Sequence, residues 1–330
     1  MNAKSKYSSW QQDLKACVVE VGELLDMLEL SHKDVGANFS AQDFRLRVPR
    51  PFIARMRKGD PQDPLLRQVL PVKQELQFMP GFVAQPLEES RFSPVPGLLH
   101  KYHGRVLWLF TGACAVNCRY CFRRHFSYEE NVVGTNKWPA IIDYISKDKT
   151  IEEVILSGGD PLLANDEMLS QCLERIAEIP HVKTLRIHTR LPVVIPARIT
   201  EKLVKNLTNK PFKAILVVHC NHPDECDSQV QRVMQQCRQG GIIVFNQAVL
   251  LAGVNDHQQV QIQLSKRLFE CDVLPYYLHL LDPVAGAAHF DVSETKAKVI
   301  MKALRKQLPG YLVPKLVREV PGDSGKTAIF

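Results

Sequence analysis

Apolar positions are spaced differently in the first hundred residues and in the rest of the chain. Near the start they recur at intervals of three and four, which predicts one amphipathic helix. Residues 49–96 are rich in proline and charge, which predicts short helices and loops packed on a core. We therefore expect residues 1–95 to form a mainly helical N-terminal extension. The apolar positions of the predicted helix are Trp10, Leu14, Val18, Val21, Leu24, Leu25 and Leu28.

From residue 106 onward, short apolar and β-branched runs alternate with stretches of helical periodicity. Each run predicts a buried strand, and each intervening stretch predicts a helix. A strand and its helix together span roughly thirty residues, the size of a βαβ unit. The predicted fold over residues 96–330 is therefore α/β, with a parallel sheet that is doubly wound or curled into a partial barrel. The six runs begin near Val106, Glu153, Thr184, Lys213, Ile242 and Val273.

Polar residues suited to catalysis or ligand binding gather where the predicted strands end. The carboxyl ends of the strands in a parallel barrel meet at one mouth, where active sites form. We therefore expect one mouth to collect the cysteines within 114–121, the Ser-Gly-Gly-Asp segment 157–160, His188 with Arg190, His219 with His222, Gln247, and Asp282.

The composition of the 330 residues restricts the class of protein. No uncharged apolar stretch reaches the roughly 18 residues of a membrane span, and the first twenty residues lack the apolar core of a signal peptide. We therefore expect a cytoplasmic protein without membrane association. Because thiols stay reduced there, the nine cysteines predict core packing or metal ligation and not a disulfide scaffold.

The formal net charge of +7 is compatible with a nucleic-acid partner. However, the 42 lysines and arginines are scattered without a long basic run. Anionic small molecules would also favour a positive pocket, so the charge by itself does not favour nucleic acid.

Three cysteines, Cys114, Cys118 and Cys121, lie in one loop after the first predicted strand. Three thiolates at this spacing can hold one face of a [4Fe–4S] cluster and leave the fourth iron open to a substrate-like ligand. The alternative is a zinc site completed by His103 or His125. Zinc usually takes its cysteines in pairs from two separate segments, so the spacing favours the cluster.

With the aromatic Tyr120 before the last cysteine, the C-x3-C-x2-C loop resembles the signature of radical S-adenosylmethionine (SAM) enzymes. The resemblance implies a partial parallel (β/α)6 barrel with the cluster after the first strand. It also implies that the open iron chelates SAM, which is cleaved to a 5′-deoxyadenosyl radical. The residues it places around SAM are Tyr120, Ser157, Gly158, Gly159, Asp160, His188 and His219.

Lys326 lies in the segment Pro-Gly-Asp-Ser-Gly-Lys. A lysine there can hold pyridoxal 5′-phosphate as a Schiff base, although the segment by itself is more typical of an exposed tail. Together with CRYCFRR, SGGDPL and HCNHPDE, in unbroken order over residues 100–326, it resembles the lysine 2,3-aminomutase family. Within the family, the chain is most similar to the short bacterial branch that makes (R)-β-lysine for modification of elongation factor P.

The family resemblance implies which residues bind pyridoxal phosphate. Lys326 would hold the cofactor covalently. Lys101, Arg105 and Gln247 would bind its phosphate, a task that suits cationic side chains. Lys101 departs from the longer members of the family, which have arginine at this position.

The resemblance also implies the substrate contacts. Arg123 would bind the α-carboxylate, and Asp282 and Glu319 would receive the ε-ammonium of lysine. A buried ammonium needs an opposite charge beside it. Glu319 stands where the family pattern has aspartate, so it places its carboxylate one methylene further along.

Taken together, the resemblance implies an isomerase that converts L-α-lysine to β-lysine. It would use a [4Fe–4S] cluster, SAM, pyridoxal phosphate and an external electron donor. The zinc site formed by the C-terminal extension of longer members is not expected, and a homodimer stays open. The alternatives are a 2,3-aminomutase of another amino acid, a radical SAM enzyme that modifies nucleic acid without pyridoxal phosphate, and a non-catalytic iron–sulfur or zinc protein.

Overall fold

The computed structural model describes residues 9–38, 44–128, 134–323 and 325–330. Its centre is a nine-stranded sheet whose strands follow one another in chain order. The strands are β1 (Leu98–Tyr102), β2 (Arg105–Thr111), β3 (Glu153–Gly158), β4 (Thr184–Thr189), β5 (Lys213–His219), β6 (Ile243–Val249), β7 (Leu274–His279), β8 (Lys315–Arg318) and β9 (Thr327–Ala328).

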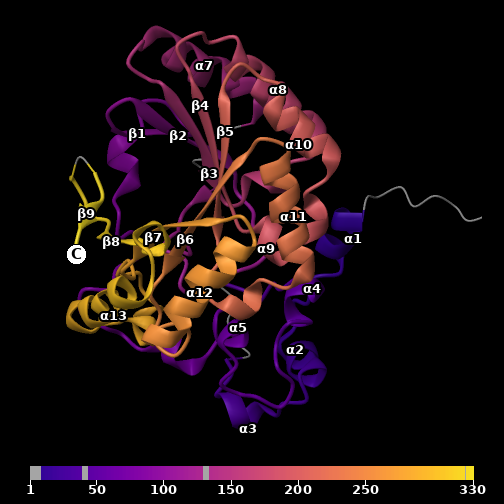
Figure 1. Cartoon of the computed structure of the whole chain (residues 1–330), viewed down its shortest axis with the longest axis vertical. Helices are drawn as coiled ribbons and strands as arrows, with labels where there is room; N and C mark the ends of the chain where they lie inside the picture. The colour runs from indigo at the N-terminus through magenta and orange to yellow at the C-terminus, as the bar shows by residue number, and fades with distance from the viewer. Residues whose placement is uncertain (1–8, 39–43, 129–133, 324) are drawn as a thin grey trace, which may run out of the picture.

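The sheet is a partial barrel. Strands β2 to β8 run parallel to their neighbours, while β1 and β9 pair antiparallel at the two edges. A doubly wound sheet reverses its strand order at a switch point. The strand order does not reverse anywhere in the described chain, which excludes the doubly wound sheet. Because β1 and β9 stand at separate edges, the barrel is open (Figure 1).

The structure has seven parallel strands where the sequence predicted six. The additional strand, β8, contains two buried residues, Leu316 and Val317, between the exposed Lys315 and Arg318. An apolar run of two residues is too short to stand out from a loop. The consequence for the site is large, because Glu319 follows β8 directly and Lys326 directly precedes β9.

Helices follow the strands and pack on the outer face of the sheet, as Figure 1 shows for α8, α10 and α11. Five of them begin at a polar side chain that accepts a backbone N–H bond of the first turn, namely Asn165, Thr200, Asp227, His257 and Ser293. The bounds are α7 (Trp138–Lys147), α8 (Asp166–Ala177), α9 (Leu191–Val194), α10 (Glu201–Thr208), α11 (Ser228–Gln239), α12 (Gln258–Glu270) and α13 (Glu294–Gln307).

The prediction of one N-terminal helix is wrong. Val18 and Val48 exchange backbone hydrogen bonds of 2.8 and 2.9 Å, so the chain is extended at Val18 and the helical pattern is divided. The result is α1 and α2, and three single-turn helices follow. These helices are α1 (Ser9–Lys15), α2 (Val21–Met27), α3 (His32–Val35), α4 (Arg50–Ile53) and α5 (Pro64–Arg67).

The N-terminal segment and the barrel share one apolar core. Buried residues of the segment, such as Leu24 and Phe52, belong to the same cluster as Trp108 of β2 and Leu185 of β4. The division near residue 95 therefore stays a prediction. Among the described helices, none is long and apolar enough to cross a membrane.

Candidate active site

Residues along the parallel strands β4 and β6 alternate between half-buried and buried positions. On β4 the half-buried positions include Arg186 and His188. Because successive residues of a strand face opposite sides of the sheet, the half-buried set lines the inside of the barrel. His219, Gln247 and Tyr277 lie in register on β5, β6 and β7 and therefore share this inner face.

The cysteine loop follows β2 at the carboxyl ends of the strands, as predicted. The N-terminal segment holds it in place: the backbone N–H of Arg119 donates to the Gln68 carbonyl at 2.9 Å, and the Arg119 Nε donates to Glu75 at 2.8 Å. Burial raises the pKa of the Cys121 thiol to about 11 and also raises that of Cys114. Thiolates are therefore costly here without the positive charge of a metal, and the loop fits an iron–sulfur cluster.

The geometry does not favour the zinc alternative. His103 lies at the amino ends of the strands, the opposite side from the cysteines. The ring of His125 lies 3.0 Å from the Ala285 carbonyl oxygen.

Two glycines allow the end of β3 to pass against the cysteine loop. Gly158 has a φ of +112°, and a Cβ at Gly159 would lie 2.2 Å from the Ala113 carbonyl oxygen. The two segments are joined by bonds from the backbone N–H of Gly159 to Thr111 and from that of Asp160 to Ala113, at 2.7 and 2.8 Å. The glycines thus have a structural task in this chain, and their predicted SAM contact stays a prediction.

Gly159→Ala is expected to disturb the cysteine loop, because the clashing atom belongs to the backbone and cannot rotate away. We expect a loss of about 1–3 kcal/mol in the free energy of unfolding, typical of overpacking, and fewer than four irons per chain after anaerobic reconstitution. Gly310→Ala is the matched control, since its Cβ would meet nothing within 4 Å. Equal iron content and melting temperature in both variants would contradict this account.

Arg123 is buried and pairs with an acid that the sequence did not single out. Its Nε and Nη2 donate to the carboxylate of Glu89 at 2.8 and 2.6 Å, and its Nη1 donates to the Gly158 carbonyl and the Ser157 hydroxyl. Burial opposes the charge, but Glu89 outweighs it and raises the pKa of Arg123. These contacts use one N–H of Nε, one of Nη2 and two of Nη1, leaving one of the five for a ligand.

Glu319 joins the two lysines assigned to pyridoxal phosphate. Its carboxylate accepts hydrogen bonds from Lys101 at 2.8 Å and Lys326 at 2.9 Å, and a further one from the Tyr102 hydroxyl. Burial opposes its ionisation, but Lys326 and these hydrogen bonds lower the pKa of Glu319. The structure therefore brings Lys326, Lys101 and Glu319 together. The Glu319 carboxylate is paired with both lysines.

Asp282, by contrast, is half-buried and has spare hydrogen-bonding capacity. Burial raises its pKa to about 7, although Lys326 acts in the opposite direction. Its Oδ1 has no partner within the described chain. Buried polar atoms are normally satisfied, so an unpaired set on the strand ends indicates space for a ligand. Besides Asp282, the residues at the carboxyl ends of the strands that have an unpaired buried atom include Thr111, His188, Arg190 and His279.

The histidines predicted to contact SAM differ in their surroundings. His188 is half-buried, its Nε2 is shielded from solvent without a partner, and burial lowers its pKa. His219 lies 2.9 Å from the Tyr120 hydroxyl and stacks on that ring, and burial lowers its pKa to about 3. Both rings are therefore neutral. The Tyr120 hydroxyl lies in a buried hydrogen-bond network that also contains Gln68 and Asn221.

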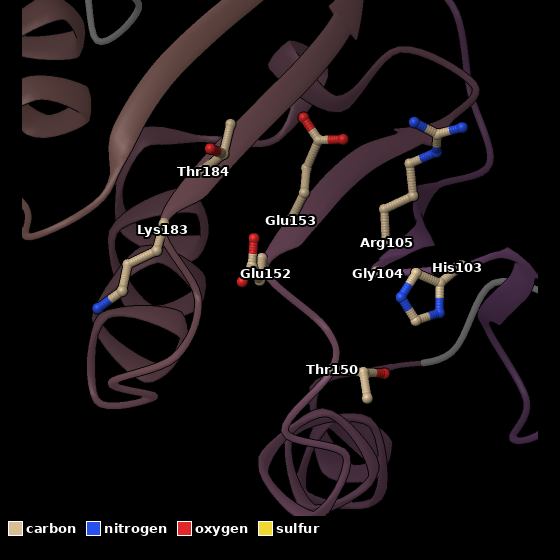
Figure 2. Close-up of a pocket in the computed structure, with 8 residues that line it drawn as sticks. All are labelled: His103, Gly104, Arg105, Thr150, Glu152, Glu153, Lys183 and Thr184. Carbon is tan, nitrogen blue, oxygen red and sulfur yellow. The ribbon is translucent and has the colours of Figure 1, made fainter.

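Arg105 lines an open pocket of about 620 Å³ at the amino ends of β2, β3 and β4. Figure 2 shows Arg105, Glu153 and Thr184 projecting from the starts of these strands. The guanidinium of Arg105 lies 4.8 Å from the centre of the Tyr102 ring. Because the Tyr102 hydroxyl bonds to Glu319, Arg105 is one side chain away from the Lys101–Glu319–Lys326 group.

Comparison with known proteins agrees with this arrangement. A family model described as the radical SAM superfamily matches residues 108–262. The matched region extends from β2 into α12 and includes the cysteine loop.

Relatives match over nearly the whole chain. It is 48% identical to the L-lysine 2,3-aminomutase of Escherichia coli (strain K12), over 100% of this chain and 96% of the relative. It is 47% identical to that of Haemophilus influenzae, over 97% and 95%, and 35% identical to that of Clostridium subterminale, over 98% and 78%. The crystal structure of a radical SAM methyltransferase from Sphaerobacter thermophilus matches with a TM-score of 0.48 and 18% identity, over 67% of this chain and 68% of that chain.

Proposed function

Because the chain belongs to the L-lysine 2,3-aminomutases of the radical SAM superfamily, we propose which of its residues carry out the lysine rearrangement. The enzyme is an isomerase that moves the amino group of L-lysine from C2 to C3. Its cofactors are a [4Fe–4S] cluster, SAM and pyridoxal phosphate. When bound, the cluster with SAM supplies a carbon radical that removes hydrogen, and pyridoxal phosphate delocalises the unpaired electron while nitrogen migrates.

At the mouth of the barrel, Cys114, Cys118 and Cys121 would ligate three irons of the cluster. The half-buried loop supports this assignment, since the thiols of Cys114 and Cys121 need a metal beside them to carry charge. SAM would lie between this loop and the strand ends that carry the unpaired Thr111 hydroxyl and the His188 ring.

Lys326 would hold pyridoxal phosphate, with Lys101, Arg105 and Gln247 at its phosphate. The observation that carries this assignment is the meeting of Lys101, Lys326 and Glu319 at 2.8 and 2.9 Å, although 218 residues separate Lys101 from Glu319. Glu319 holds the Lys326 ammonium until the cofactor binds.

The substrate would bind between a cation and an acid. Arg123 would take the α-carboxylate through its remaining N–H, while Glu89 holds the guanidinium in place. Asp282 would take the ε-ammonium as its main partner, because its carboxylate is unpaired whereas Glu319 already binds two lysines. Closing these contacts around the substrate excludes water from the reacting carbons.

The resemblance to the short bacterial branch also leads us to propose (R)-β-lysine as the product and modification of elongation factor P as its use. On this view the enzyme acts in the cytoplasm, takes electrons from an external donor and has no nucleic-acid substrate. The division of the chain into a 1–95 extension and a 96–330 barrel belongs to the same proposal.

The direct test is an anaerobic assay that supplies reductant, SAM, pyridoxal phosphate and one α-amino acid at a time. Chiral chromatography of the products should detect (R)-β-lysine from L-lysine and little turnover of glutamate or neutral amino acids. The (S) isomer would overturn the proposed stereochemistry. Rapid turnover of another amino acid at the expense of lysine would overturn the substrate contacts.

A further inference from the structure

Arg190 is a buried charged residue with no part in the roles proposed so far. It follows β4 and precedes α9, and 6% of it is exposed. Its backbone N–H donates to the Asp160 carboxylate at 2.7 Å, and the Thr189 hydroxyl donates to the same carboxylate at 2.7 Å. The end of β3 therefore fixes the backbone from which the Arg190 side chain extends.

The guanidinium of Arg190 contacts the cysteine loop. Its Nη1 donates to Cys118 Sγ at 2.7 Å and to the Tyr120 hydroxyl at 2.9 Å. Its Nη2 points the other way, donating to Gln68 at 2.6 Å and to Glu225 at 3.0 Å. Hydrogen bonds at both terminal nitrogens thus fix the planar guanidinium of Arg190, with Nη1 facing the Cys118 sulfur.

Glu225 is the counter-charge that keeps Arg190 in this position. It is fully buried and accepts hydrogen bonds from the Gln68 amide and from the backbone N–H groups of Asn221 and His222, at 2.9 to 3.0 Å. Burial opposes its ionisation, but Arg190 and these hydrogen bonds lower the pKa of Glu225. The pair is therefore charged, and its positive end faces Cys118.

We propose that Arg190 is a positioning residue that sets the reduction potential of the cluster through a charged hydrogen bond to the Cys118 sulfur. The inference rests on the proposed ligation by Cys118. Hydrogen bonds to the sulfurs and nearby charge are the protein's means of adjusting such potentials. Reduction adds negative charge to the cluster, and a cationic donor stabilises that charge. Arg190 therefore makes the cluster easier to reduce.

The test measures the midpoint potential of the cluster in the reconstituted full-length protein. Electron paramagnetic resonance monitors the reduction of the cluster during the titration. Arg190→Met alone would leave the buried Glu225 carboxylate without its counter-charge, a severe destabilisation, so the double variant R190M/E225Q is used. It should lower the equilibrium constant for reduction about tenfold, which is ~59 mV for one electron. Glu225→Gln alone removes the opposing charge and keeps the arginine, so it should raise the potential.

The matched control is R198M/D166N, which removes a second arginine–acid pair in which the arginine is fully buried and makes no contact with the cysteine loop among its described hydrogen bonds. Its potential should equal that of the unaltered protein. Iron and sulfide analysis tests cluster ligation separately. An unchanged potential in R190M/E225Q with four irons bound would overturn the role of Arg190. If R190M/E225Q does not assemble the cluster, Glu225→Gln provides the test. A midpoint potential in Glu225→Gln that is no higher than that of the unaltered protein would then overturn the role of Arg190.

Discussion

Lys326→Ala should abolish β-lysine formation, lowering the turnover number by at least ~10³-fold, as expected for loss of a group that binds a cofactor covalently. The protein should also lose the visible absorbance of bound pyridoxal phosphate. The fold should survive, because Glu319 keeps its 2.8 Å pair with Lys101. Turnover, absorbance spectra and a melting curve measure the three effects.

Lys326→Arg separates covalent binding from charge. Arginine keeps the cation beside Glu319 but cannot form an imine, so the variant should be as inactive as Lys326→Ala while melting like the unaltered protein. Lys315→Ala removes an exposed lysine of β8 and should leave activity unchanged. If Lys326→Arg retained substantial turnover, Lys326 would act through its charge alone and the cofactor assignment would fail.

The barrel could be predicted because each parallel strand from β2 to β7 carries enough apolar residues to be recognised locally. The register of polar residues at the strand ends then followed from the geometry of parallel sheets. The predicted strands and helices differ from the structure at positions where a long-range contact determines the secondary structure. The Val18–Val48 bridge divides the predicted N-terminal helix, and β8 is a strand because β7 lies beside it.

The partners within the site were beyond prediction for the same reason. Glu89 begins a 3-10 helix of four residues in a proline-containing segment, and its pairing with Arg123 spans 34 residues. Arg190 reaches Cys118 across 72 residues and Gln68 across 122. No local periodicity carries such information. A family pattern could assign Glu319 to a substrate ammonium, but only the folded chain reveals that two lysines of the protein already use that carboxylate.

The difference between Asp282 and Glu319 leads to the second large effect. Asp282→Asn keeps the size of the side chain and removes its charge, so the ε-ammonium loses its main partner. A hydrogen bond to a charged group contributes about 1.5–3 kcal/mol, which corresponds to a rise in KM for lysine of roughly 10- to 150-fold. Glu319→Gln should instead change the KM for lysine less than Asp282→Asn does, because the Glu319 carboxylate is already paired with Lys101 and Lys326.

The pH dependence of kcat/KM tests the same assignment. In the free enzyme, burial holds the pKa of Asp282 at about 7, and only the ionised form attracts an ammonium. The value of kcat/KM for lysine should therefore rise as pH increases through about 7, and Asp282→Asn should lose this rise. The free energy of unfolding should change in the opposite direction, decreasing as pH rises. The raised pKa of Asp282 favours the folded state at pH values below the unfolded pKa of about 3.9, and this contribution to stability is lost as pH rises through about 7. A rise in kcat/KM that persists in Asp282→Asn would assign the ionisation to another group and contradict the role of Asp282.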